Sequence, residues 1–463
     1  MTTSEDEPAD KETPRIESER RAAHWIPSHR RNELRALALR SRQVILLAAV
    51  TGIVTGLVVA GFDRLVVDGL YDHVLEFPLW AIAVLPGIGL AVSATARYFI
   101  GPRVSPSTAD EYLHAFHEPD YRLGFRALVA RLVGALATLG SGGPMGLEGS
   151  SMYAGATIGS QLQRRFPATF KNTDRRTLLV AGAAAGVSAI FKAPATGVVF
   201  ALEVPFQGDL ARRMLLPSLV SSASSYLVFA AINGTAPLFP NLGSPGFNFR
   251  DLLGALVVGV LAGVGARGFA WMLRKAKAIS ANAKALPAIA GAAVALAATF
   301  VLGRLLTGES LLVGAGYQVL TWAADPGRSV WIVLAILVLR CFATSATIAG
   351  GGVGGLFIPL VVAGALTGAV VGHAVNRVDL GFFIVIGVAA FLGAGYRVPL
   401  AAIMFVAETT GRASFVVPAL IAAVAAELAM GESSVTRYQK NTPHLAPLEF
   451  QERLRSAIEE DES

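Results

Sequence analysis

Residues 140–150 read Gly140-Ser-Gly-Gly-Pro-Met-Gly-Leu-Glu148-Gly-Ser150, which places one carboxylate in a glycine-dense, apolar part of the chain. Glycines beside Glu148 let the backbone leave helical geometry and turn its N–H groups toward a cavity. A carboxylate held among such donors occupies a place that an anion could take. The stretch therefore predicts an anion pore that its own glutamate can block. The alternative is a glycine-rich helix-packing face with a solvated acid.

The composition of the chain indicates whether it is surrounded by water or by lipid. Hydrophobic residues make up 53% of the 463 residues and charged residues 16%, with a mean hydropathy of +0.55. This leaves too little polar surface for a soluble globule. Several apolar stretches are too short, or too broken by Gly and Pro, to be simple spans of roughly 20 residues, which is typical of transport proteins. We therefore predict an all-α polytopic membrane protein with broken intramembrane helices.

The charges at the ends of the chain predict its topology. Nine Lys and Arg residues lie within residues 1–42, and no apolar core of a signal peptide is present. The positive-inside rule then predicts a cytoplasmic N-terminus, with the basic loop 164–176 on the same side. These charges favour topology signals over a nucleic-acid site. We expect a cytoplasmic leader (1–43), a membrane domain (44–438) and a short cytoplasmic tail (439–463), in the plasma (inner) membrane.

The membrane domain contains an internal repeat. Placing residues 138–159 over 347–368 aligns Thr, four glycines, Leu and Ala-Gly-Ala, with Phe357 opposite Glu148 at an offset of 209 (357 − 148). Residues 182–203 match 387–408 at an offset of 205 (399 − 194), pairing Lys192 with Arg397, Pro194 with Pro399, Phe200 with Phe405 and Glu203 with Glu408. Two such halves, about 44–232 and 252–438, predict inverted repeats with a site between them near the bilayer midplane.

These motifs also carry a family resemblance. The segment Gly146-Leu-Glu148-Gly-Ser150 resembles the G-(K/R)-E-G-P signature of the CLC family of chloride channels and chloride/proton exchangers, and Gly355-Leu-Phe357-Ile-Pro359 is similar to its G-x-F-x-P signature. Residues 182–203 resemble the family's glycine-rich run that ends in Phe-x-x-Glu. The likeness extends from about residue 33 to residue 438.

The resemblance implies a set of functional residues. Glu148 corresponds to the gating glutamate, which fills the external anion site when ionised and leaves it when protonated. The implied anion-binding residues are Ser107, with Ser105 as second choice, and Gly146, Gly149, Phe357, Ile358 and Tyr438. Around Ser107 the flanking glycines of the family motif are missing. Tyr438 is alternatively an interfacial anchor.

The resemblance also implies an assembly and a partner set. We expect a homodimer in the lipid bilayer with one pore in each subunit, carrying chloride or a similar small anion. Because 25 residues follow Tyr438 (463 − 438), we expect no cytoplasmic CBS domains. No cofactor, metal site or enzyme active site is predicted, since no paired catalytic acids or Ser/His/Asp set appears.

The residue at position 204, a valine, bears on whether chloride transport is coupled to protons. Exchangers of the family often carry an internal glutamate directly after the Phe-x-x-Glu acid, but here valine follows Glu203. Glu203 itself is a weak proton-relay candidate, because one step along a helix turns a side chain by about 100°, and a structural role is the other reading. We therefore expect passive chloride conduction. The alternatives are a chloride/proton antiporter, a fluoride exporter of the same family, and a membrane carrier for an organic substrate.

Overall fold

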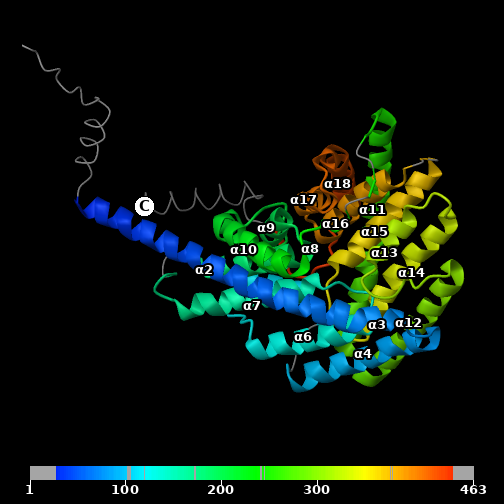
Figure 1. Cartoon of the computed structure of the whole chain (residues 1–463), viewed down its shortest axis with the longest axis horizontal. Helices are drawn as coiled ribbons and strands as arrows, with labels where there is room; N and C mark the ends of the chain where they lie inside the picture. Colours follow the sequence, from blue (N-terminus) through cyan, green and yellow to red (C-terminus); the bar gives the residue numbers. More distant parts are fainter. Residues whose placement is uncertain are drawn as a thin grey trace, which may run out of the picture.

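The computed structural model describes residues 28–101, 106–118, 120–170, 174–239, 242–243, 246–375, 377 and 379–441. Most of the predicted leader (1–43), most of the predicted tail (439–463) and Ser105 lie outside these ranges. Figure 1 shows helices throughout the described chain. Its strands are one short parallel pair, β1 (Phe206–Gln207) with β2 (Lys440–Asn441).

Eight helical segments of the described chain are long and apolar enough to cross a membrane. The α-helices are α2 (Ser28–Val66), α3 (Asp72–Leu75), α4 (Leu79–Phe99), α5 (Thr108–His117), α6 (Phe125–Gly140), α7 (Glu148–Arg165), α8 (Thr177–Phe191), α9 (Pro194–Glu203), α10 (Leu215–Asn233), α11 (Phe249–Asn282), α12 (Ala285–Thr307), α13 (Tyr317–Ala323), α14 (Val330–Ala349), α15 (Phe357–Ala374), α16 (Gly381–Tyr396), α17 (Pro399–Thr410) and α18 (Val416–Met430). A π-helical turn (Val67–Tyr71) follows α2, and 3₁₀ turns (Arg212–Met214 and Ala413–Phe415) precede α10 and α18. The predicted all-α membrane fold with broken helices is confirmed.

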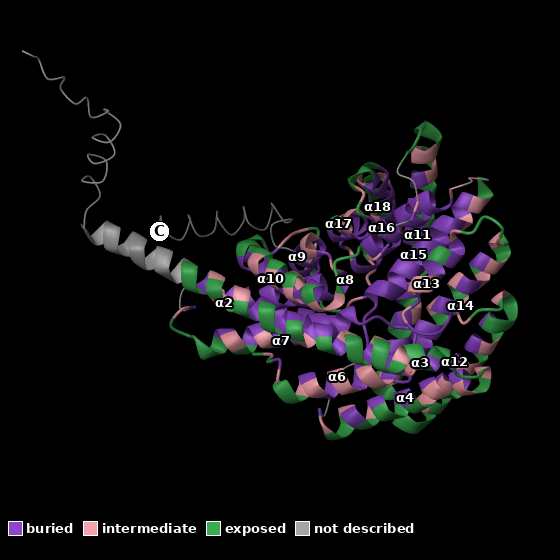
Figure 2. Cartoon of the chain, in the orientation of Figure 1, coloured by how far each residue is buried: buried purple, intermediate pink, exposed green. Residues whose placement is uncertain are grey.

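The helices fall into a buried central group and a more exposed outer group. Figure 2 shows buried residues concentrated in α7, α8, α15 and α16, and exposed residues along the outer faces of α4 and α12. Many of the exposed residues are large and apolar, such as Leu256, Val260 and Val264 on one side of α11. Apolar side chains turned outward suit contact with lipid tails, so the central helices are shielded by an outer ring.

The repeat is visible as helix packing. Helices α7 to α10 correspond to α15 to α18 by the sequence offsets, and α7 packs on α8 as α15 packs on α16. A Cβ atom added at Gly155 would lie 2.0 Å from the Gly182 carbonyl oxygen, and one at Gly364 would lie 2.3 Å from that of Gly387. These glycines occupy equivalent repeat positions. Their small size lets the backbones approach closely.

Two equivalent residues turn the chain between broken helices. Lys192 and Arg397 are the non-glycine residues of the described chain with positive φ, at 52° and 58°. Each ends one helix two residues before a proline that begins the next, at Pro194 or Pro399. Left-handed backbone costs about 1 kcal/mol for such residues. Carbonyl contacts secure both side chains, from Lys192 Nζ to Asn233 (3.1 Å) and from Arg397 Nη1 to Gly431 (2.6 Å).

Candidate functional site

The two repeats meet at paired glycines. The Gly146 N–H donates to the Gly355 carbonyl (3.0 Å), and the Gly355 N–H donates to the Gly146 carbonyl (2.7 Å). These residues occupy the same repeat position, so a pseudo-twofold axis passes between them. Helices α7 and α15 begin two residues later, and their N-termini therefore face one another and the helices run apart. This arrangement is the predicted inverted repeat.

The Glu148 side chain lies on the N-terminus of the opposite repeat. Its Oε1 accepts hydrogen bonds from the backbone N–H groups of Phe357 (2.6 Å) and Ile358 (3.4 Å). The side chain is buried, with the residue 3% exposed, and Oε2 has no hydrogen-bond partner among the described residues. A helix N-terminus carries partial positive charge, so the carboxylate occupies an anion-binding position.

Glycines make room for this carboxylate. An added Cβ would lie 1.8 Å from Glu148 Oε2 at Gly146 and 2.1 Å from Oε1 at Gly355. At Gly149 it would lie 2.1 Å from Thr108 Oγ1 and 2.8 Å from the Gly355 Cα atom. Any side chain at these positions would occupy the carboxylate's space or separate the repeats.

Ser107 reaches the same place from a separate element. It is the N-cap residue of α5, is buried, and its backbone bridges to Gly354, next to Gly355. Thr108 Oγ1 also donates to the Gly354 carbonyl (3.4 Å). The structure thus brings together Ser107, Gly146, Glu148, Gly149, Phe357 and Ile358. Thr108 was not predicted, although its position beside Ser107 was a signal for it.

The sequence profile of the family described as voltage gated chloride channel matches residues 88–431, which is most of the chain. The chain belongs to this family. Chloride-channel-family relatives include the H(+)/Cl(-) exchange transporter ClcA of Salmonella paratyphi B (strain ATCC BAA-1250 / SPB7) and that of Salmonella typhi. Each is 27% identical over 439 residues, covering 88% of this chain and 90% of the relative.

Solved structures of the same family share the fold. A slow cyanobacterial Cl-/H+ antiporter matches with a TM-score of 0.72 and 21% identity, covering 84% of this chain and 94% of that one. A CLC-type fluoride/proton antiporter matches with a TM-score of 0.74 and 23% identity, covering 87% and 98%. The expectation of passive conduction is not supported, because the relatives that match are named as exchangers.

The phenol beside Phe357 is Tyr396 and not Tyr438. Tyr396 is 2% exposed, and its ring centroid lies 6.4 Å from that of Phe357. Tyr438 is 41% exposed and its ring stacks on His114 at 4.7 Å. The structure therefore does not bring Tyr438 to the Glu148 cluster.

The position of Tyr438 follows from its neighbours. The preceding Arg437 N–H donates to Asp110 (3.1 Å), whose other carboxylate oxygen accepts from Lys277 (2.7 Å). This buried pair holds the segment against α5. Tyr396 was missed because it ends α16 in a run of small apolar residues, although its place just before Arg397 in the repeat was a usable signal.

Glu203 caps a helix of the other repeat. Its carboxylate accepts from the N–H groups of Leu400 (3.1 Å) and Ala401 (2.8 Å), the first turn of α17. Glu408, its repeat partner, accepts from Ala195 (2.9 Å) and Thr196 (2.7 Å) in the first turn of α9. The two acids are reciprocal caps that tie the repeats together, which favours the structural reading of Glu203. The adjacent Val204 is fully buried.

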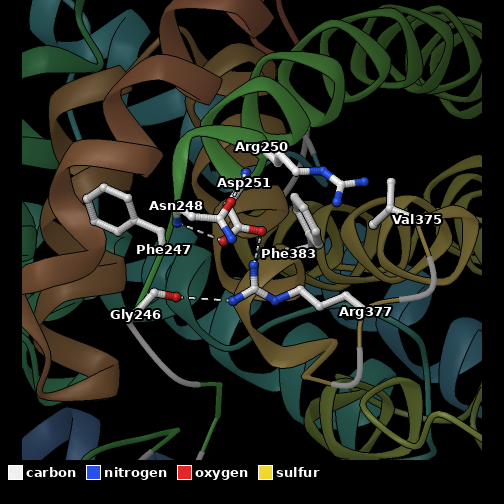
Figure 3. A pocket seen from close by; sticks show the side chains of 8 residues that line it. All are labelled: Gly246, Phe247, Asn248, Arg250, Asp251, Val375, Arg377 and Phe383. Atoms are coloured by element: carbon white, nitrogen blue, oxygen red, sulfur yellow. Dashed lines mark hydrogen bonds and ion pairs between the residues drawn. The ribbon is translucent and has the colours of Figure 1, made fainter.

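One cavity adjoins the Glu148 site, and a larger pocket lies apart from it. A small, mostly apolar cavity of about 80 Å³ adjoins the site, lined by Leu147 together with Met145, Tyr71 and Tyr317. A larger pocket of about 530 Å³, shown in Figure 3, lies between the start of α11 and the segment after α15. There Arg377 pairs with Asp251 and donates to the Gly246 carbonyl (3.1 Å). None of the predicted site residues lines this second pocket.

Proposed function

We propose that this protein is a membrane exchanger that moves chloride against protons. In this proposal Glu148 binds the proton, and its carboxylate competes with chloride for the same position. The observation that carries the proposal is the Glu148 carboxylate on the Phe357 N–H group, where a negative charge replaces a bound anion. The similarity to relatives named H(+)/Cl(-) exchange transporters supports exchange over passive conduction.

The chemistry is a competition for the same donors. When Glu148 is ionised, its carboxylate fills the N-terminus of α15 and excludes chloride. When it takes up a proton, the charge-assisted hydrogen bond from Phe357 is lost, a change of about 1.5–3 kcal/mol per bond. Chloride then takes the position at the helix N-terminus, with the hydroxyls of Ser107 and Tyr396 as further donors. Chloride occupies the helix N-terminus when Glu148 is protonated, and the ionised carboxylate occupies it when chloride is absent. One residue therefore couples the movement of both ions.

The proton path on the Glu203 side runs through water in this proposal. Val204 offers no titratable group, and Glu203 is held by two backbone N–H groups of α17. An apolar stretch accepts no proton, and a bare charge there is costly, so only a file of water molecules or Glu203 itself could bridge this gap.

An organic substrate fits less well. The cavity beside Leu147 holds about 80 Å³, well below the roughly 300–1,000 Å³ typical of small-molecule sites. The donors at the site are backbone N–H groups and hydroxyls, which suit a small anion. Transport, rather than an enzyme reaction, is what this geometry supports.

We also propose the membrane orientation and assembly. Asp174 and Arg176 share a surface pocket with Arg212 and Arg213, so the loops 174–176 and 209–214 lie on one face. By the positive-inside rule that face is cytoplasmic. The plasma membrane is part of the same proposal. A homodimer with one site in each subunit is the expected assembly, and the mass of the detergent-solubilised complex tests it.

The test of exchange uses proteoliposomes at equal internal and external pH. An outward chloride gradient should drive protons uphill in the wild type at a fixed ratio. Glu148→Gln should carry chloride without proton movement, whereas Glu76→Gln, a matched change at an exposed glutamate, should retain coupling. Wild-type chloride flux with no uphill proton movement would refute exchange. Replacing chloride by fluoride in the same assay distinguishes a fluoride exporter.

A further inference from the structure

A basic pocket lies at the far end of α7, away from Glu148. It holds about 320 Å³ and is lined by Arg122, Arg164, Arg175 and Arg176, with Ser160 and Gln163 from the last turns of α7. Phe170 and Leu179 form part of its apolar wall. The pocket thus joins three segments, residues 115–122, the end of α7 and the start of α8.

Most of the positive charge in this pocket is unmatched. Arg176 is paired with Asp174 through two contacts of 2.9 Å. Arg122, Arg164 and Arg175 are exposed and make no ion pair within 4 Å in the described part of the chain, although Arg175 lies near the charge of Asp174. Water and salt screen these charges, so an oxyanion that contacts several of the guanidinium groups at once would replace water as their partner.

A hydroxyl group on a buried residue, Ser160, also lines the pocket. Ser160 is 8% exposed, lines the pocket, and makes no hydrogen bond within the residues that the structure describes. The neighbouring Gln163 is fully engaged, because its Nε2 donates to the Asp174 carbonyl (3.0 Å) and its Oε1 accepts from the Leu178 N–H (2.8 Å). Both ends of the Gln163 amide are therefore engaged within the protein, whereas the Ser160 hydroxyl is available to an occupant of the pocket.

The pocket of Figure 3 provides a contrast. There the guanidinium of Arg377 is matched by Asp251, and Asp251 also belongs to the capping box of α11. An arginine in a pocket is thus not in itself a sign of a ligand. The pocket at the end of α7 differs because it gathers three guanidinium groups without an ion pair among the described residues, whereas the pocket of Figure 3 has one, that of Arg250.

We propose that this pocket binds a phosphate group, carried either by a soluble phosphate compound or by an anionic lipid headgroup. Arginine presents forked donors that match phosphate oxygens in pairs, and several arginines around one concave site favour a multiply charged oxyanion over chloride. The volume is at the small end of the range for organic ligands, which suits one phosphate group with a short substituent. This site is separate from Glu148 and does not depend on the transport proposal.

The soluble arm of the test titrates inorganic phosphate into the purified full-length protein by calorimetry at constant chloride. The Arg122→Gln, Arg164→Gln double variant should raise the dissociation constant about tenfold or more, because two charge-assisted contacts are lost. Arg165→Gln is the matched control, since Arg165 is exposed like Arg122 and Arg164 and adjoins Arg164 but does not line the pocket. Ser160→Ala provides a second variant without charge change, with an expected weakening of about threefold.

The lipid arm measures phosphatidylglycerol retained on the protein by native mass spectrometry, with phosphatidylcholine for comparison. Selective retention that is lost in the double variant and kept in Arg165→Gln identifies a lipid headgroup. Phosphate binding without lipid selectivity identifies a soluble ligand. The proposal is overturned if the wild type binds neither probe, or if the double variant binds both as the wild type does.

Discussion

The Glu148 carboxylate accepts a 2.6 Å hydrogen bond from the N–H group of Phe357, the residue at the same position of the second repeat. The Glu203 and Glu408 carboxylates make the same kind of contact, each capping a helix of the other repeat. That second relationship is reciprocal, whereas the first runs one way, because phenylalanine has no carboxylate to return. At the Glu148 position, only one of the two repeats therefore places a carboxylate on the helix N-terminus of the other.

Glu148→Ala should remove the pH dependence of anion flux. In the wild type, acidification neutralises the carboxylate and frees the α15 N-terminus, so flux should rise as pH falls. In the variant nothing competes with chloride, so flux should be high and flat across the same range. Chloride flux from liposomes at several pH values measures this, and an unchanged pH response in the variant would show that Glu148 is not the gate.

Gly355→Ala should expel the glutamate from its site without removing it. The new methyl group would lie 2.1 Å from Glu148 Oε1, which the site cannot accommodate. We expect a weaker pH response than in the wild type. Gly268→Ala is the matched control, because an added Cβ there meets nothing within 4 Å. Equal pH responses in both glycine variants would contradict the steric account.

Two variants, Glu203→Gln and Glu408→Gln, distinguish a helix-capping role of Glu203 from a proton-relay role. Both variants should lower stability by about 1–2 kcal/mol, since each weakens charged contacts to a helix N-terminus. If Glu203 only caps α17, proton coupling per chloride should be alike in the two variants. Selective loss of uphill proton movement in Glu203→Gln would instead assign the relay to Glu203, and thermal unfolding in detergent provides the stability comparison.

Tyr396→Phe should weaken chloride binding, and the effect should grow when Ser107→Ala is added. Loss of both hydroxyl donors should cost about 1–3 kcal/mol, the scale of hydrogen bonds to charged groups. Tyr438→Phe should leave the affinity unchanged because its ring stacks on His114. Calorimetric titration with chloride decides between the two tyrosines, and an effect confined to Tyr438→Phe would restore the sequence-based assignment.

Because of His117, we expect the free energy of unfolding to be lower in mild acid than at neutral pH. It lies at the end of α5, outside the membrane-spanning helices, with Nε2 2.8 Å from the Pro205 carbonyl. Burial lowers the pKa of His117. The unfolded chain therefore binds a proton near pH 6.5 before the folded protein does, and stability falls as pH drops below about 6.5.

His117→Gln should reduce this loss of stability, whereas the change at an exposed histidine, His73→Gln, should not. Unfolding midpoints at about pH 7.5 and pH 5.5 provide the comparison. A wild-type midpoint that does not fall on acidification would contradict the role of His117.

The sequence alone determined the membrane class, the two repeats and the register that sets Phe357 opposite Glu148. Those features are local or periodic: hydrophobic composition, glycine spacing and matched motifs are all readable along one chain. The repeat also marked the equivalent positions of Lys192 and Arg397, and of Glu203 and Glu408, before their geometry was known.

Only the tertiary structure decided which side chains meet. The sequence pointed to Tyr438, but the Asp110–Lys277 pair holds the segment before Tyr438 against α5, and Tyr396 lies beside Phe357. The capping role of Glu203 likewise depends on N–H groups about 200 residues away. Such contacts arise where two inverted halves pack across a pseudo-twofold axis, and the direction of a side chain across that axis is set by three-dimensional packing rather than by local sequence.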